Sequence, residues 1–506
     1  MSCKERRNER QKEREQKILN DIENGEAIYV KYEKRENKRT MPNRKGLART
    51  PEEESEHRQE TVEKAVIVYR KMLPDVIKKL NKIKDVRQPG KVKHKLTVLM
   101  AYGILLFVYQ LGSRRNANRT MSNSIFYQNL KSMFPELETI PHADTLARLL
   151  ENIEVEQIQE CMIELLKDLI RRKKFKNYLI NNKYVLAIDG TQKFYRSYNW
   201  QEECLKRHTG ENKTAQYYVY VLDCTLILEN GIVLPVMSEI LENKDYKTEE
   251  EKQDCERKAF ERVAEKLKRI FKGKQIVVLL DGLYACGPIM RTCKNNGWDY
   301  MIVLKEDSLP NVWHEALGLM KIESDNRLKV IWGERTQIYS WANDIIHEYG
   351  RNDRFKIECH VVICQESWKE KCSRSTQEEK EMKTRYVWIS SKRLNKNNVF
   401  NRCTKIARSR WKIENNILVE KHQGYKNEHC YSYDWKAMKG FHYLMKIGHF
   451  INNLALNSEL LEDKVEELGI RGFIEYFRLA CSGSLLDGQK IAEAINSKKV
   501  WKLRSA

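Results

Sequence analysis

The chain has 506 residues, and 41% of them are hydrophobic, so neither a small disulfide-stabilised domain nor a mostly disordered protein is expected. Its 92 Lys and Arg residues outnumber its 71 Asp and Glu residues, which gives a formal net charge of +21. Nucleic acid is the expected partner, because Lys and Arg neutralise phosphates and release counterions on binding. The alternative is a cationic protein that binds no nucleic acid.

Several features indicate a cytoplasmic protein without a membrane span. The thirteen cysteines include no C-x-x-C pair, and the charged N-terminus contains no signal peptide, so reduced and mostly buried thiols are expected. The longest apolar run, residues 96–111, is shorter than a membrane span and includes Thr97 and Gln110, so it predicts a buried helix. The chain also lacks the P-loop and H-E-x-x-H motifs of ATPases and zinc proteases.

The N-terminal third divides into two regions. Residues 1–60 are polar and rich in charges of both signs, which predicts a basic, loosely ordered arm. In residues 61–180 the apolar side chains recur at helical spacing, so this region is expected to be helical.

Two polar segments lie inside this helical region. Residues 113–123 (SRRNANRTMSN) predict a basic loop in which Arg114 and Arg115 contact phosphate, and a solvated loop without a ligand is the alternative. Farther along, Asp144 or Thr145 is expected to cap a helix that follows Pro141.

Strands and helices alternate in residues 181–305. Two short apolar runs, residues 184–189 and 275–281, each end in Asp-Gly, which predicts a buried strand that meets a turn. The other expected elements are a hairpin of residues 217–227 and 232–241, helices at 249–271 and 284–296, and a strand at 300–304. This alternation predicts a mixed sheet covered by helices.

The remaining chain divides into three regions. Residues 306–390 are β-rich and contain five of the ten tryptophans, one of which is a candidate for stacking on a displaced base. Core packing is the commoner role for such tryptophans. Residues 391–460 and 461–506 are expected to be helical.

Three carboxylates are candidates for a metal site. Asp189 and Asp281 end buried strands, although Asp-Gly is also a common turn dipeptide. Glu414 lies on a predicted helix with Arg410 four residues before it and Lys421 seven residues after it, so the three share a face. Three carboxylates can hold two Mg²⁺ ions, and the flanking cations can contact phosphate.

This arrangement resembles that of DDE transposases of bacterial insertion sequences, in the family named after insertion sequence four. Arg410, Glu414 and Lys421 match the last three positions of its signature Y-x2-R-x3-E-x6-K, whereas Ala407 stands at the Tyr position. Residues 411–416 (WKIENN) resemble a variant of the motif in related transposases, which indicates a divergent branch. The similarity extends over roughly residues 90–460.

The resemblance implies an RNase H-like core that a β-rich insertion interrupts before the Glu helix. The core would comprise residues 181–305 and 391–460, and the insertion residues 306–390. Asp189, Asp281 and Glu414 would be the catalytic metal ligands, with two Mg²⁺ ions as cofactor and Mn²⁺ as a substitute. Arg410 and Lys421 would contact DNA.

The implied function is that of a DNA transposase in the bacterial cytoplasm, associated with the nucleoid. It would bind the terminal inverted repeats of its element through residues 61–180 and the basic arm, cleave the ends by hydrolysis, and join the 3′-hydroxyls to target DNA. A homodimer on double-stranded DNA is expected, because paired ends must be cut together. The alternatives are an RNase H-fold nuclease without strand transfer and a catalytically retired DNA-binding derivative.

Overall fold

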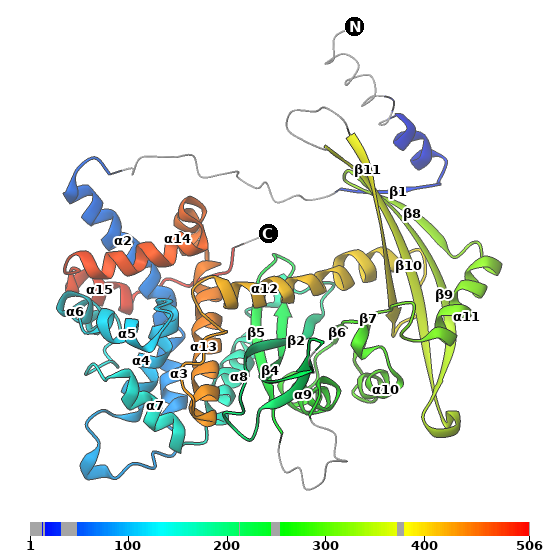
Figure 1. Cartoon of the computed structure of the whole chain (residues 1–506). Coiled ribbons are helices and arrows are strands. Elements are labelled where there is room, and N and C mark those ends of the chain that lie inside the picture. Colours follow the sequence, from blue (N-terminus) through cyan, green and yellow to red (C-terminus); the bar gives the residue numbers. More distant parts are fainter. Residues whose placement is uncertain are drawn as a thin grey trace. The chain divides into compact units, whose positions relative to one another are not determined.

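The structure is a computed structural model that describes residue 13 and residues 16–31, 48–211, 213–243, 254–371 and 379–504. The chain is mixed α/β, with strands in parallel and antiparallel pairs and helices against them, which confirms the expected class (Figure 1). Its contacts divide it into two units. The strand-rich unit is Met1–Asn37 with Gln275–Arg410, and the helical unit is Lys38–Lys274 with Trp411–Ala506.

From residue 48 on, where the structure describes it, the helical unit begins with seven α-helices, as the apolar spacing predicted. They are α2 (Pro51–Arg70), α3 (Leu73–Leu80), α4 (Leu96–Val108), α5 (Arg114–Met121), α6 (Ser124–Met133), α7 (Ala143–Asn152) and α8 (Glu156–Arg171). Helix α2 starts inside the stretch that we expected to be loosely ordered, because Thr50 caps it and Pro51 fits its first position.

Residues 96–108 of the apolar run form the buried helix α4, as expected. It packs against α13 (Trp435–Leu456), which also contacts α7, α8 and a strand, β5 (Val233–Leu241) (Figure 1). Glycines allow this close approach, since a Cβ on Gly448 would lie 2.8 Å from Phe107 Cβ. None of the helices in the described ranges is long and apolar enough to cross a membrane.

The strands of the helical unit form an antiparallel group around β4 (Thr214–Ile227). One side of β4 pairs with β2 (Tyr184–Arg196), and the other pairs with β3 (Leu205–Thr209) and β5. The predicted β4–β5 hairpin is confirmed, and Gly231 takes a positive φ in its turn. The predicted end of the first strand at Asp189 is wrong, because β2 continues for seven residues beyond it.

Helices cover both faces of these strands. Helix α9 (Glu256–Ile270) contacts β4 and β5, and Glu239 of β5 pairs with Arg262 and Lys266 of α9. Helices α12 (Trp411–His422) and α13 lie on the opposite face, where Lys446 of α13 pairs with Asp223 of β4. Helices α14 (Glu462–Gly483) and α15 (Gly488–Asn496) complete the unit against α2 and α6.

In the strand-rich unit the strand order is β1-β8-β9-β10-β11-β7-β6. The strands are β1 (Ile28–Val30), β6 (Ile276–Leu280), β7 (Asp299–Val303), β8 (Arg327–Trp332), β9 (Arg335–Tyr349), β10 (Phe355–Lys371) and β11 (Glu379–Ser390) (Figure 1). Helices α10 (Gly287–Asn295) and α11 (Pro310–Ile322) pack on them. The β-rich character of residues 306–390 is confirmed, whereas the parallel pairing of β1 with β8 was not predicted.

The segment that carries the signature is not one uniform helix. It comprises a π-helix, η5 (Asn401–Ile406), then a 3-10 helix, η6 (Ala407–Arg410), and then α12. The spacing argument therefore holds only within α12, where Glu414 and Lys421 share a face. Arg410 ends the 3-10 helix and belongs to the strand-rich unit.

Candidate active site

Two of the three predicted metal ligands lie on packed elements of the helical unit. Asp189 lies within β2, and Glu414 lies in the first turn of α12, which packs against β2. Both side chains are half-buried. Because side chains alternate between the faces of a strand, Asp189 shares a face with its cross-strand neighbour Asp223. That is the face on which α12 and α13 lie.

A buried ionic network fixes α12 on this face. Lys446 Nζ lies 2.8 Å from Asp223 Oδ2 and 2.6 Å from Glu420 Oε2, so one ammonium joins β4, α12 and α13. His449 Nδ1 lies 2.8 Å from the other oxygen of Glu420. All four side chains are at most 3% exposed. These paired and hydrogen-bonded charges fix how α12 is rotated about its axis and where it lies along the sheet. They therefore fix the position of Glu414.

A second buried contact ties β2 to the segment after α12. Lys193 is the extra residue of a β-bulge, which turns its side chain inward. Its Nζ donates to the backbone oxygen of Asn427 at 2.5 Å and to Asn427 Oδ1 at 2.8 Å. Burial, together with the charge of Lys446, lowers the pKa of Lys193 to about 7. One buried network thus ties α12 to β4, the neighbour of β2, and the other ties β2 itself to the segment that follows α12.

Asp281, the third predicted ligand, lies in the strand-rich unit. It follows β6 directly and caps η3 (Gly282–Tyr284), where its Oδ1 accepts a hydrogen bond from Leu283 N at 2.9 Å. The predicted strand end is confirmed, and so is the turn-forming role that Asp-Gly commonly has. Asp189 and Glu414 belong to the helical unit, and the meeting of Asp281 with them stays a prediction.

The predicted DNA contacts Arg410 and Lys421 differ in their surroundings. Arg410 is buried, whereas Lys421 is half-buried and its Nζ lies 3.1 Å from Glu428 Oε1. Ala407, at the position of the signature Tyr, is also buried.

Another buried charge of the strand-rich unit holds the chain just before Arg410. The carboxylate of Glu366 on β10 pairs with Arg335 and Arg408 and accepts a hydrogen bond from Gln337 Nε2 at 2.6 Å. Arg408 also lies over the rings of Trp332 and Tyr386, at 5.3 and 5.0 Å. The β-rich region thereby fixes η6.

Three of the five tryptophans of this region are core residues, namely Trp313, Trp341 and Trp388. Trp332 and Trp368 are half-buried, and each lies against an arginine of the Glu366 cluster. Core packing therefore accounts for most of the tryptophans, and no residue is selected for base stacking.

The two polar segments of the N-terminal region lie together. The expected basic loop is wrong: residues 114–121 form α5, because Ser113 caps it by accepting a hydrogen bond from Asn116 N. The cap of α7 is His142 rather than Asp144 or Thr145. Asn118 Oδ1 accepts a hydrogen bond from the backbone N–H of Ala143 at 2.8 Å, which links α5 to α7.

Arg114 belongs to a basic patch that the sequence did not reveal. Its guanidinium lies 3.4 Å from Asp144, whereas Arg115 is exposed. Burial lowers the pKa of His429, and the charges of Lys193, Arg114, Arg196 and Lys426 lower it further. Lys193 is buried, and we call the other three cations the Arg114 patch; they come from α5, the end of β2 and the segment after α12. No sequence spacing joins them, so only the fold brings them together.

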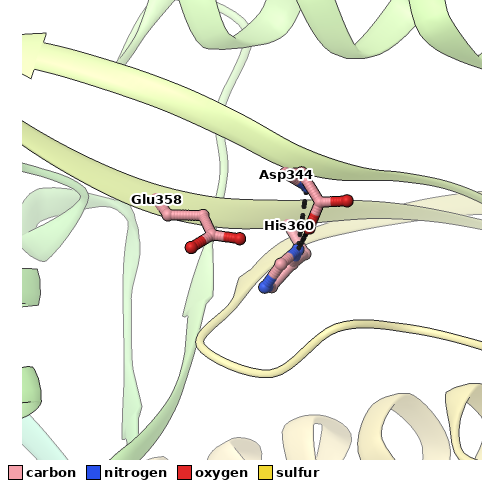
Figure 2. Close-up of side chains that lie close together, drawn as sticks. All are labelled: Asp344, Glu358 and His360. Atoms are coloured by element: carbon pink, nitrogen blue, oxygen red, sulfur yellow. Dashed lines mark hydrogen bonds and ion pairs between the residues drawn. The ribbon is translucent and has the colours of Figure 1, made fainter.

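A separate cluster on β9 and β10 contains Asp344, Glu358 and His360, whose ligand atoms lie within 4.8 Å of one another (Figure 2). His360 Nδ1 accepts a hydrogen bond from the backbone N–H of Asp344 at 3.0 Å, which leaves the ring proton on Nε2. Burial lowers the pKa of His360 to about 4, and Arg393 pairs with the Asp344 carboxylate. The imidazole therefore offers no lone pair, and we assign no metal here.

Comparison with known proteins bears on the helical unit. Residues 77–166 match the family model described as DDE_Tnp_1-associated. The match associates this chain with DDE-type transposases. It runs from within α3 to within α8 and includes the α5–α7 junction with Arg114. A search of curated proteins found no match.

Proposed function

We propose that this chain is a DNA transposase with an RNase H-like core, which binds the terminal inverted repeats of its own element. It cleaves the ends by metal-dependent hydrolysis and joins the freed 3′-hydroxyls to target DNA. The observation that carries the proposal is the packing of α12, with Glu414, against β2, with Asp189, in a chain associated with DDE-type transposases.

The donor set fits magnesium, because carboxylate oxygens are the ligands that Mg²⁺ prefers. Asp189 and Glu414 would hold the ions together with Asp281, and the buried network of Lys446 would keep Glu414 in place. When bound, Mg²⁺ supplies positive charge to the attacking and leaving oxygens of a phosphodiester. Arg410 and Lys421 would orient the scissile strand by contacting its phosphates.

Binding of the terminal repeats is assigned to the helices before residue 180, with the Arg114 patch and Arg115 as phosphate contacts. Three clustered cations suit a phosphate backbone, whose contacts position a protein on DNA. A homodimer assembled on DNA would cut both ends together.

The test is a cleavage and strand-transfer assay with labelled terminal-repeat DNA, Mg²⁺ and the full chain. Asp189→Ala, Asp281→Ala and Glu414→Ala are each expected to abolish cleavage but spare end binding. The control is Glu265→Ala, which changes an exposed carboxylate of α9. Cleavage that survives Asp281→Ala would refute the assignment.

The same assay separates the two alternatives. Cutting without joining would favour a nuclease on the same core. End binding without any cutting by the unmodified chain would favour a retired DNA-binding derivative.

A further inference from the structure

Gly190, the residue after Asp189, does not lie in a turn. It lies inside β2, and its φ is outside the left-handed region. A glycine within a strand often marks a place where another group comes close to the backbone. Here a Cβ would lie 2.7 Å from both Cδ and Oε2 of Glu256 and 2.6 Å from Cε1 of Tyr220. The missing side chain makes room for a carboxylate against β2, one residue from Asp189.

Tyr220 holds this carboxylate in place. Its hydroxyl donates a hydrogen bond to Glu256 Oε1 at 2.8 Å, while Oε2 faces Gly190. Burial raises the pKa of Tyr220, and the charges of Glu256 and Asp189 both raise it further. The Tyr220 hydroxyl is therefore close enough to Glu256 and Asp189 for both negative charges to act on it.

The two carboxylates approach β2 from its two faces. Asp189 shares the face of Asp223, on which α12 lies, and Gly190 shares the opposite face with α9, whose first residue is Glu256. The N-terminus of α9 stabilises a negative charge by itself, by less than about 1 kcal/mol. That effect accounts for an acid in the first turn, but it does not require the carboxylate to lie against Gly190.

We propose that Glu256 is a further metal-binding carboxylate of the Asp189 site, and that Tyr220 and Gly190 position it. The inference rests on the proposed function. Mg²⁺ takes octahedral coordination, so two ions about 3.5–4 Å apart can accept a carboxylate besides those of the signature. Glu414 reaches the site from the face of α12, and Glu256 reaches it from the face of α9. Glu256 is not part of the signature by which the chain resembles transposases.

The experiment measures metal binding directly as well as activity. Mn²⁺ is titrated calorimetrically into the full chain without DNA, and Mg²⁺ is titrated in the cleavage assay. Glu256→Gln keeps the shape of the side chain and removes its charge, and Glu265→Gln is the exposed control on the same helix. Tyr220→Phe keeps the charge and removes the positioning hydroxyl.

Glu256→Gln is expected to weaken Mn²⁺ binding and to raise the half-maximal Mg²⁺ concentration, each by about 10-fold or more. Tyr220→Phe is expected to produce a smaller shift in the same direction, and Glu265→Gln none. End binding measured in EDTA should not change, and thermal melting should show that the variants are folded.

Two results would be decisive against the inference, and they are distinguishable. If Asp189→Asn weakens Mn²⁺ binding and Glu256→Gln does not, Glu256 is no ligand and the proposed function stands. If the unmodified chain neither binds Mn²⁺ nor cleaves terminal-repeat DNA, the proposed function itself fails.

Discussion

Replacement of Lys446 with Met removes the cation that two buried carboxylates share. The Asp223 and Glu420 side chains are 2% and 0% exposed, so water cannot take over the role of the ammonium. Loss of one partner of a buried ion pair destabilises a protein by about 3–5 kcal/mol, because an uncompensated charge stays buried. For a large domain this corresponds to a fall in Tm of about 6–10 °C.

The assay is urea unfolding at pH 7, with Lys436→Met as the control. Lys436 is exposed on the same helix, so its replacement should change the free energy of unfolding by less than about 0.5 kcal/mol. A triple variant that adds Asp223→Asn and Glu420→Gln to Lys446→Met should recover most of the loss, because it removes the buried charges. Destabilisation by Lys446→Met no larger than that of the control would refute the reasoning.

Acid unfolding gives the prediction a second measurement. Burial raises the pKa of Glu420, but the charge of Lys446 and the hydrogen bond and charge of His449 lower it to about 2, from 4.5. A lowered folded-state pKa means stability that is present above about pH 4.5 and is lost as the pH falls towards 2. Burial raises the pKa of Asp223, so the acid-dependent loss comes from Glu420. Lys446→Met should therefore reduce the loss of stability between about pH 4.5 and pH 2.

Three further predictions concern other parts of the helical unit. The pKa of Lys193 is lowered from 10.5 to about 7, so between these pH values the unfolded chain binds more protons than the folded chain. The free energy of unfolding should therefore rise with pH across this window. Lys193→Met should abolish that rise in urea unfolding measured from pH 7 to 10. Arg196→Ala and Lys426→Ala should each reduce the salt dependence of DNA binding by about one counterion, and an unchanged slope would exclude them as phosphate contacts. Gly448→Ala should lower the free energy of unfolding by about 1–3 kcal/mol, because the new Cβ would lie 2.8 Å from Phe107 Cβ. An unchanged melting curve would contradict this close packing of α4 and α13.

The sequence predicted those elements whose pattern is local. Residues 96–108 form a buried helix because nearly every side chain in them is apolar, and the β4–β5 hairpin forms because Gly231 supplies the positive φ of its turn. Asp281 was placed correctly at a strand end for the same reason, since its hydrogen bond to Leu283 N is local.

Contacts between distant segments could not be predicted in this way. Lys446 and Glu420 resemble surface residues in the sequence, and only the packing of α12 on β2 and β5 and of α13 on β5 buries them together. Gly190 was interpreted as a turn residue because its role depends on Glu256, 66 positions later in the chain. The pairing of β1 with β8 likewise joins segments that no local pattern relates.

The signature itself combines two kinds of information. Glu414 and Lys421 are seven residues apart within α12, so their relation follows from helix geometry alone. Arg410 precedes that helix, in a 3-10 turn whose neighbour Arg408 is held by Glu366 of the β-rich region. The contact between Glu366 and Arg408, which are 42 residues apart in the sequence, therefore holds the 3-10 turn that contains Arg410. This gives the β-rich region a physical role, because it fixes the segment that leads into the helix of Glu414.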